Sequence, residues 1–107
     1  MGKDPVLNDA DFEKTVRETA LPVLVEFWAS WCLPSQMMAP VLDRMREEYV
    51  GRVRILALNV DRNPGARIKF GIQGCPTFIL FKDGRETTRK IGALSEGQLA
   101  RLIESAL

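Results

Sequence analysis

Apolar residues recur along the chain with two different spacings, and each spacing predicts a different kind of element. Residues 23–28 form an almost unbroken apolar run, which predicts a strand buried on both faces. Residues 53–60 have the same character and predict a second central strand. A third strand is predicted at about 77–81 and a fourth near 86–91, because the Asp83-Gly84 pair between them is typical of a two-residue hairpin turn.

Four stretches with helical periodicity lie around these strands. Asn8 is expected to cap the first helix, and the second extends from about 34 to 49, with Pro40 expected to kink it. A short third helix begins near Asn63-Pro64, and a capping-box pattern at Ser95 begins the last one. Since helices alternate with strands, we predict an α/β fold in which a mixed sheet has helices on both faces.

Composition limits the classes of function. A length of 107 residues suffices for one globular domain over 1–107. The composition, 46% hydrophobic and 27% charged, is that of a globular protein and not of a disordered chain. A net charge of +1 gives no reason to expect nucleic acid or an anionic membrane as a partner. Histidine is absent, which excludes Cys-His and Ser-His nucleophile pairs, and two cysteines are too few for a structural zinc site. We expect neither a metal nor a bound cofactor.

The sequence shows no targeting or membrane segment. No apolar run follows the charges of the first residues, as a signal peptide would require. The most apolar stretch, residues 21–31, is interrupted by Pro22 and Glu26 and is far too short to span a bilayer. We therefore expect a cytoplasmic protein with no membrane partner, and we expect it to be a monomer.

Cys32 lies where the first buried strand ends and the long helix begins. A thiol at a helix N-terminus faces unpaired N–H groups and the positive end of the helix dipole, which favour the nucleophilic thiolate. The neighbouring Trp31 can shield one side of the sulfur and leave the other accessible. Taken alone, a cysteine after a strand is more often a small buried apolar residue, so the surrounding motifs decide between the two readings.

Two further features bear on this chemistry. Glu26 lies within the apolar strand, where a carboxylate is costly unless it is protonated or paired. It is either an edge residue that reaches solvent or a proton acceptor with a raised pKa behind the reactive sulfur. The segment Gly74-Cys75-Pro76-Thr77 precedes the third strand, a place where an X-Pro bond can be cis and fix a sharp entry into the strand.

These segments belong to a larger set of motifs spread over about residues 12–107. The set comprises Phe27-Trp28-Ala29, Trp31-Cys32 with Pro34, Ala39-Pro40, Asn59-Val60-Asp61, Asn63-Pro64-Gly65, Pro76-Thr77, Lys82-Asp83-Gly84 and Gly92-Ala93-Leu94-Ser95. With these motifs the chain resembles the thioredoxin family. The resemblance implies a thioredoxin fold, with a central five-stranded mixed sheet flanked by four helices. It also implies a thiol–disulfide oxidoreductase, in which the first cysteine of Cys-Gly-Pro-Cys attacks a protein disulfide and the second releases the product.

The same resemblance implies site residues and partners. Pro76 would be cis and lie against the Cys32 nucleophile, and an extended substrate segment would pair with the backbone at Gly74 and Cys75. The partners would be disulfide-containing proteins and, for recycling, thioredoxin reductase or a small-thiol reductant. The residues expected to shape the substrate groove are Trp31, Leu33, Pro34, Gly74, Pro76, Thr77 and Gly92.

The chain departs from the family pattern at three positions. Position 35 is serine, so the motif reads Cys32-Leu33-Pro34-Ser35, and a hydroxyl cannot form the disulfide that resolves a mixed disulfide. Ser35 can still donate a hydrogen bond to the Cys32 thiolate. Glu26 stands in place of a buried aspartate, and Ala57 in place of a frequent lysine near it. Loss of that cation is expected to raise the pKa of Glu26.

These departures leave several interpretations open. Cys75 is either the partner thiol of Cys32 or the occupant of a small apolar slot. A disulfide between them requires Cα atoms within about 7 Å, a distance that the sequence does not show. The chain is then an oxidoreductase with Cys32 as nucleophile, a redox-inactive or single-turnover binding module, or a Cys32/Cys75 redox sensor. Ser35 is compatible both with a natural monothiol form and with an engineered trapping variant.

Overall fold

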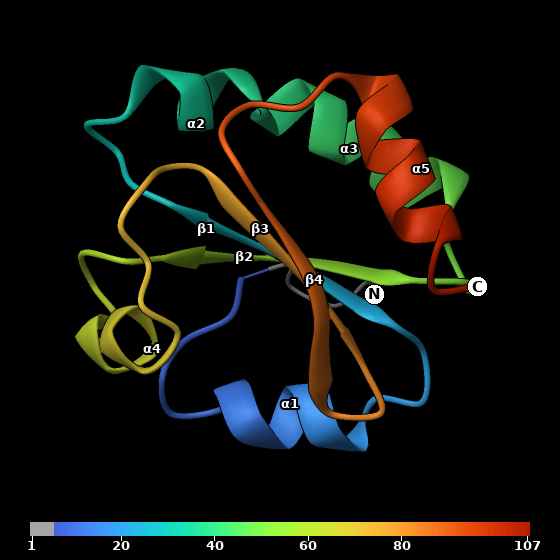
Figure 1. Cartoon of the computed structure of the whole chain (residues 1–107), viewed down its shortest axis with the longest axis horizontal. Helices are drawn as coiled ribbons and strands as arrows, with labels where there is room; N and C mark the ends of the chain where they lie inside the picture. The colour runs from blue at the N-terminus through green and yellow to red at the C-terminus, as the bar shows by residue number, and fades with distance from the viewer. Residues whose placement is uncertain (1–5) are drawn as a thin grey trace.

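The computed structural model describes residues 6–107, and Figure 1 shows a twisted sheet between two layers of helices. The strands lie in the order β2-β1-β3-β4. β1 is parallel to β2 and antiparallel to β3, and β3 forms an antiparallel hairpin with β4. The mixed sheet predicted from the sequence is therefore confirmed, with β1 at its centre. The strand bounds are β1 (Val23–Trp28), β2 (Arg54–Asn59), β3 (Thr77–Lys82) and β4 (Arg85–Ile91).

The expected five-stranded sheet is wrong for residues 6–107, which form four strands. Beside β2, a single parallel bridge pairs Val6 with Ala57, and the Leu7 N–H donates to the Ala57 carbonyl at 2.8 Å. Within the described residues β2 is thus an edge strand and not the second central strand that we expected. Its apolar run arises because helices cover both faces: Ile55 packs in one apolar cluster and Leu56 in the other.

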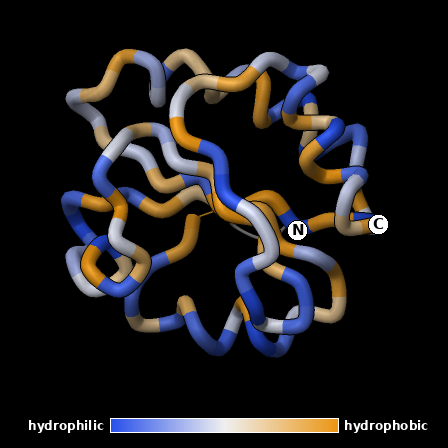
Figure 2. Tube along the Cα trace, viewed as in Figure 1, coloured by the Kyte–Doolittle hydropathy of each residue, from blue (hydrophilic) through white to orange (hydrophobic). Residues whose placement is uncertain are grey.

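The helices divide between the two faces of the sheet (Figure 1). α1 (Phe12–Glu18) and α4 (Pro64–Lys69) cover one face, while α2 (Leu33–Met37), α3 (Ala39–Glu48) and α5 (Glu96–Glu104) lie on the other. Each layer encloses its own apolar cluster, and β1 contributes to both because successive side chains of a strand point to opposite faces. Figure 2 shows the hydrophobic colour running through the central strands. None of the helices within residues 6–107 has the length and hydrophobicity of a membrane span.

The helix predicted between Pro34 and Tyr49 consists of two helices, α2 and α3, joined at Met38. Pro40 has no N–H to offer the preceding turn, so α2 cannot continue through it. In the first turn of α3 the missing N–H costs nothing, because that turn has no intrahelical acceptor for it. The predicted kink is therefore present as a break, and the four predicted helices are found with one of them in two pieces.

The turns and caps agree with the sequence except at the first helix. Asp83 and Gly84 have φ values of 53° and 80°, the left-handed pair that a tight hairpin turn needs, and the Ser95 capping box is formed. α1 begins at Phe12 with Asp11 as its cap residue, so the prediction that Asn8 caps it is wrong. Asn8 and Asp11 instead exchange backbone-to-side-chain hydrogen bonds of 3.1 and 3.3 Å, which close a turn ahead of the helix.

The N-terminus of α4 is capped from a distant part of the chain. The Asp9 carboxylate accepts hydrogen bonds from the N–H groups of Gly65 and Ala66, at 2.9 and 2.7 Å. The Asp9 N–H in turn donates to Asn63 Oδ1 at 2.8 Å. Asn63, the adjacent cap residue, makes no side-chain cap bond of its own. A negative charge at this end of the helix also suits the helix dipole.

Candidate active site

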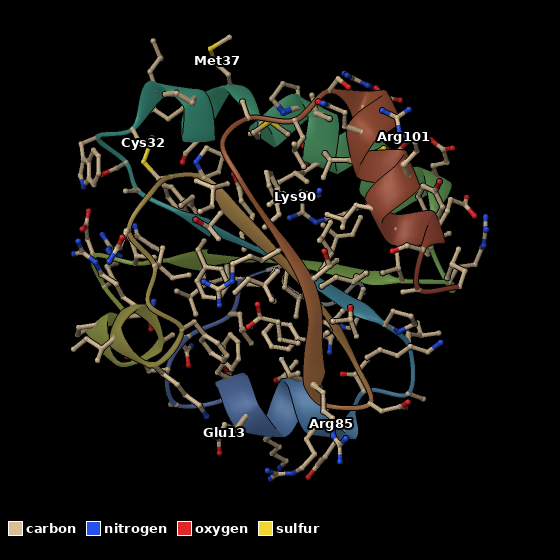
Figure 3. The ribbon with its side chains drawn as sticks, in the orientation of Figure 1. Glu13, Cys32, Met37, Arg85, Lys90 and Arg101 are labelled. Carbon is tan, nitrogen blue, oxygen red and sulfur yellow. A yellow bond between two sulfur atoms is a disulfide. The ribbon has the colours of Figure 1, made fainter. Side chains whose placement is uncertain are left out.

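Cys32 and Cys75, 43 positions apart, are joined by a disulfide with their Cα atoms 6.5 Å apart. The topology explains the proximity. Phe27 near the end of β1 pairs with Thr77 at the start of β3, so the turn after β1 and the loop before β3 meet at one end of the sheet. Figure 3 shows the sulfur of Cys32 beside that loop. Of the two readings of Cys75 that the sequence left open, the structure favours the partner thiol.

The environment of Cys32 combines burial with an acceptor. Cys32 is the cap residue of α2 and is only 7% exposed. Its Sγ lies 3.2 Å from the Cys75 carbonyl oxygen. In the reduced protein a Cys32 thiol can donate to this carbonyl, which favours the thiol over the thiolate. The N-terminus of α2 favours the opposite state, because its N–H groups attract negative charge.

The loop before β3 is tied to the end of β4. The Cys75-Pro76 peptide bond is cis, as the family resemblance implied. The Pro76 carbonyl accepts a hydrogen bond from the Gly92 N–H at 2.7 Å, and Thr77 Oγ1 donates to the Gly74 carbonyl at 2.7 Å. Gly92 has φ +100°, which favours glycine. Four of the predicted groove residues, namely Gly74, Pro76, Thr77 and Gly92, therefore lie together next to the disulfide, where hydrogen bonds join the loop before β3 to the end of β4.

Gly74 also packs against the last residue of β4. A Cβ added at Gly74 would lie 2.8 Å from Cγ2 of Ile91, closer than side chains approach one another. Ile91 itself is largely exposed. Sequence reasoning missed Ile91 as part of this surface, because nothing in the sequence states which β4 residue faces the loop.

The other predicted groove residues lie on the α2 side. Trp31 is 68% exposed and its Nε1–H donates to Asp61 Oδ2 at 2.7 Å, which fixes the indole beside the start of α2. The Asp61 N–H donates in turn to Asn59 Oδ1 at 2.9 Å. Leu33, 64% exposed, and Pro34 form the first turn of α2 next to Trp31. Asp61 was not predicted as a site residue, although it belongs to one of the motifs that carried the resemblance.

Glu26 is buried in the middle of the sheet. It pairs with Ala57 on one side and Phe78 on the other, and it is 4% exposed, so the reading of an edge residue that reaches solvent is wrong. Its Oε2 has no hydrogen-bond partner among the described residues. Burial raises the pKa of Glu26 from 4.5 to about 7, and the positive charge of Arg46 on α3 partly opposes this rise. Glu26 can therefore gain or lose a proton near neutral pH.

Ser35 shares the surroundings of Glu26. It is also 4% exposed, and its Oγ has no hydrogen-bond partner within residues 6–107. Both side chains line one groove between α2, α3 and the edge of β2, with Ala57 and Arg46 beside them. Cys75 approaches Cys32 from the loop before β3. The buried acid and hydroxyl thus lie on the helix side of the site, and the second thiol on the loop side.

Residues 6–107 contain no group of three or more side chains suited to hold a metal ion.

Comparison with known proteins shows one consistent set of relatives. The family model described as Thioredoxin matches residues 4–105. A thioredoxin of Pseudomonas aeruginosa is 44% identical over 99 residues, which is 92% of each chain. A thioredoxin of Haemophilus influenzae is 44% identical over 97 residues, 91% of each chain. A thioredoxin of a Synechocystis species is 40% identical over 107 residues, the full length of both chains.

Proposed function

The chain belongs to the thioredoxin family and is a thiol–disulfide oxidoreductase, and on this premise we propose that its redox pair is Cys32 with Cys75. The observation that carries the proposal is the disulfide between them, with Cα atoms 6.5 Å apart. Ser35 holds the position of the family's second cysteine but has no sulfur to oxidise. Cys75 supplies the missing thiol from a different segment of the chain.

The reaction proceeds in two exchanges. The Cys32 thiolate attacks one sulfur of a substrate disulfide, so that a mixed disulfide forms and the other substrate sulfur leaves as a thiolate, which takes up a proton. The Cys75 thiolate then attacks Cys32 Sγ, forms the internal disulfide and releases the second substrate thiolate, which is also protonated. The substrate gains two electrons and two protons, and the protein's two thiols are oxidised to one disulfide. A dithiol reductant returns the protein to its starting state.

Glu26 acts in this scheme as an acid–base group on the helix side of the site, in the same groove as Ser35. A pKa of about 7 lets the carboxyl accept a thiol proton and return it at neutral pH. Ser35, in the same groove, remains as a hydrogen-bond donor for a sulfur that carries negative charge. Neither group can form a disulfide, so both affect only the rates of the two exchanges, and Cys75 is the residue that releases the substrate from the mixed disulfide.

Substrates approach over the exposed surface around the disulfide. Trp31 and Leu33 provide an apolar rim on the α2 side, and Gly74, Pro76 and Gly92 provide backbone on the other. Such a surface fits an extended segment of a disulfide-bearing protein. We place the protein in the cytoplasm, where thiols are kept reduced and where thioredoxin reductase or a small-thiol pool recycles it.

The test compares Cys75→Ser with Ser35→Ala. We expect Cys75→Ser to perform the first exchange and stop, so that the protein accumulates as a stoichiometric mixed disulfide with a model protein disulfide. Ser35→Ala keeps both thiols and is expected to turn over repeatedly with dithiothreitol as reductant. Repeated turnover by Cys75→Ser at the rate of the unmodified protein would contradict the proposal.

The same disulfide also suits a redox sensor, in which the two thiols switch state without serving a substrate. Multiple turnovers of a protein disulfide by the unmodified protein favour the oxidoreductase. Reversible oxidation of both thiols without any substrate reduction favours the sensor.

A further inference from the structure

A groove with a basic lining runs between β4 and α5, next to the site described above. It has a volume of about 520 Å³. Leu94 and Leu102 provide apolar surface within it, and polar side chains line its two walls. The polar lining residues are Thr88 and Lys90 on β4 and Gln98, Arg101 and Ser105 on α5. Figure 3 labels Lys90 and Arg101, which lie on the strand and the helix on either side of this groove.

The β4 wall follows from the strand register. Lys90 pairs with Phe78 and Thr88 pairs with Leu80. Paired residues of an antiparallel sheet share a face, and Phe78 and Leu80 belong to the core beneath α5. Lys90 and Thr88 therefore lie on the α5 side of β4.

The α5 wall follows from the helical repeat. Gln98, Arg101 and Ser105 are spaced by three and four positions, so they form one ridge along the helix. The Gln98 side-chain oxygen is occupied in the Ser95 capping box, which leaves its amide NH₂ as a donor. Hydrogen-bond donors and positive charges therefore face the groove from both walls.

Among residues 6–107 no acidic side chain lines this groove, and the nearby acids are paired elsewhere. On α5, Glu96 pairs with Arg44 at 3.0 Å and Glu104 lies 3.6 Å from Arg52. Both partners come from the α3 side of α5. On β4, Glu86 pairs with Arg89.

Glu86 and Arg89 lie on the opposite face of the sheet from Lys90. Glu86 pairs across the hairpin with Phe81, which belongs to the core under α1 and α4. Arg89 donates to the Phe70 carbonyl on that same side. Within residues 6–107 neither Lys90 nor Arg101 forms an ion pair.

Lys90 brings one wall of the groove close to the active-site surface. It lies two positions before Gly92, whose N–H is bonded to the Pro76 carbonyl beside the disulfide. A substrate segment that crosses Gly92 therefore passes close to Lys90 on the groove wall. The positive charges then meet the residues that flank the substrate's cysteine.

We propose that this groove binds an acidic segment that flanks the disulfide of the protein substrate, and that Lys90 and Arg101 form ion pairs with the carboxylates of that segment. The inference rests on the proposed function, since it names the substrate class of the same site. Carboxylates of the segment act as ion-pair partners, which the two cations do not have among residues 6–107, and the apolar surface of Leu94 and Leu102 contacts the segment between its charges. Such charge complementarity contributes to specificity and to the rate of association.

The test uses disulfide peptides of one core sequence, flanked by aspartates, by serines or by lysines, with dithiothreitol as the recycling reductant. The variant is Lys90→Glu with Arg101→Glu. Its control is Lys14→Glu with Lys82→Glu, which makes the same change in net charge. Lys14 and Lys82 are exposed, the first on α1 on the opposite face of the sheet and the second at the end of β3 away from Pro76. The quantity measured is kcat/KM for each peptide, with the uncatalysed reduction subtracted.

We expect the groove variant to lower kcat/KM for the aspartate peptide about 10-fold relative to the control variant, at an ionic strength of about 0.01 M. The serine peptide should change less than about twofold, and the lysine peptide should be reduced faster. The difference between the variants should shrink at about 1 M salt, where charges are screened.

The outcomes separate the two proposals. If the unmodified protein reduces none of the three peptides catalytically, the proposed function fails. If the serine peptide is reduced normally but the two double variants treat the aspartate peptide alike, the groove inference is wrong and the oxidoreductase assignment stands. Equal loss in both variants is a net-charge effect and likewise contradicts the inference.

Discussion

Reduction of the Cys32–Cys75 disulfide should cost the protein a large part of its stability. The cross-link joins residues 43 positions apart, so it restricts a loop that spans the sheet core. In the chain-entropy model, closing a loop of this length removes unfolded-state entropy worth about 4 kcal/mol at room temperature. For a domain of about 100 residues, that difference corresponds to a fall in Tm of roughly 15–30 °C.

The assay is unfolding in denaturant and by heat, followed by far-UV circular dichroism, with and without dithiothreitol. The matched variant is Cys75→Ala, which cannot form the cross-link and in which a partly buried side chain loses only its sulfur. We expect Cys75→Ala to unfold at the same midpoint with and without reductant, close to that of the reduced unmodified protein. Ser35→Ala should keep the full difference between oxidised and reduced forms.

Two results would refute this reasoning. One is a difference of less than about 1 kcal/mol in the free energy of unfolding between the oxidised and reduced unmodified protein, because closing a loop of this length should contribute several times more. The other is a reductant-dependent loss of stability in Cys75→Ala, which would place the reducible bond elsewhere.

Three other substitutions test separate features. Glu26 has a folded-state pKa of about 7 against an ordinary value of 4.5, so its ionisation opposes folding and stability should fall by about 3 kcal/mol as pH rises from 4.5 to 7. Glu26→Gln should lack that fall in a series of denaturant midpoints, and an unchanged pH profile would count against the buried acid. Asp9→Ala removes the two hydrogen bonds that cap α4 and should cost about 1–2 kcal/mol in thermal unfolding; no loss would mean the cap is not formed. Cys32→Ser should abolish disulfide reduction, and residual activity in that variant would overturn the role of Cys32.

The elements that sequence predicts well are those whose signal is local. The apolar run of β1, the Asp83-Gly84 turn and the Ser95 capping box each depend on neighbouring residues, and each is present in the structure. The break at Pro40 is local for the same reason, since one missing N–H is enough to end α2.

Features that depend on the order of the strands could not be predicted from local sequence patterns. Burial on both faces made β2 look central, but among residues 6–107 it lies at the edge of the four strands, and helices cover both faces there as well. The pairing of Cys32 with Cys75 depends on β1 lying antiparallel to β3, which no local pattern states. Asp9 illustrates the same limit, because it caps a helix that begins more than fifty positions later.

The residues of the candidate site also fall into those with a local signal in the sequence and those that depend on the tertiary fold. Cys32 and Glu26 are recognisable from their surroundings in the chain, whereas the roles of Ile91 and Asp61 appear only when the loops of the fold are brought together. The basic groove between β4 and α5 needs both the strand register and the helical repeat before its walls can be assigned.

The most direct test of the redox pair is to map the sulfurs after a single reaction. The fully reduced protein is mixed with an excess of a peptide disulfide, quenched with acid and an alkylating reagent, and digested for mass spectrometry. We predict that Cys32 and Cys75 are recovered in one cross-linked peptide, with one peptide dithiol released for each protein molecule. Recovery of Cys75 as an alkylated free thiol, with Cys32 still bonded to the peptide, would contradict the account.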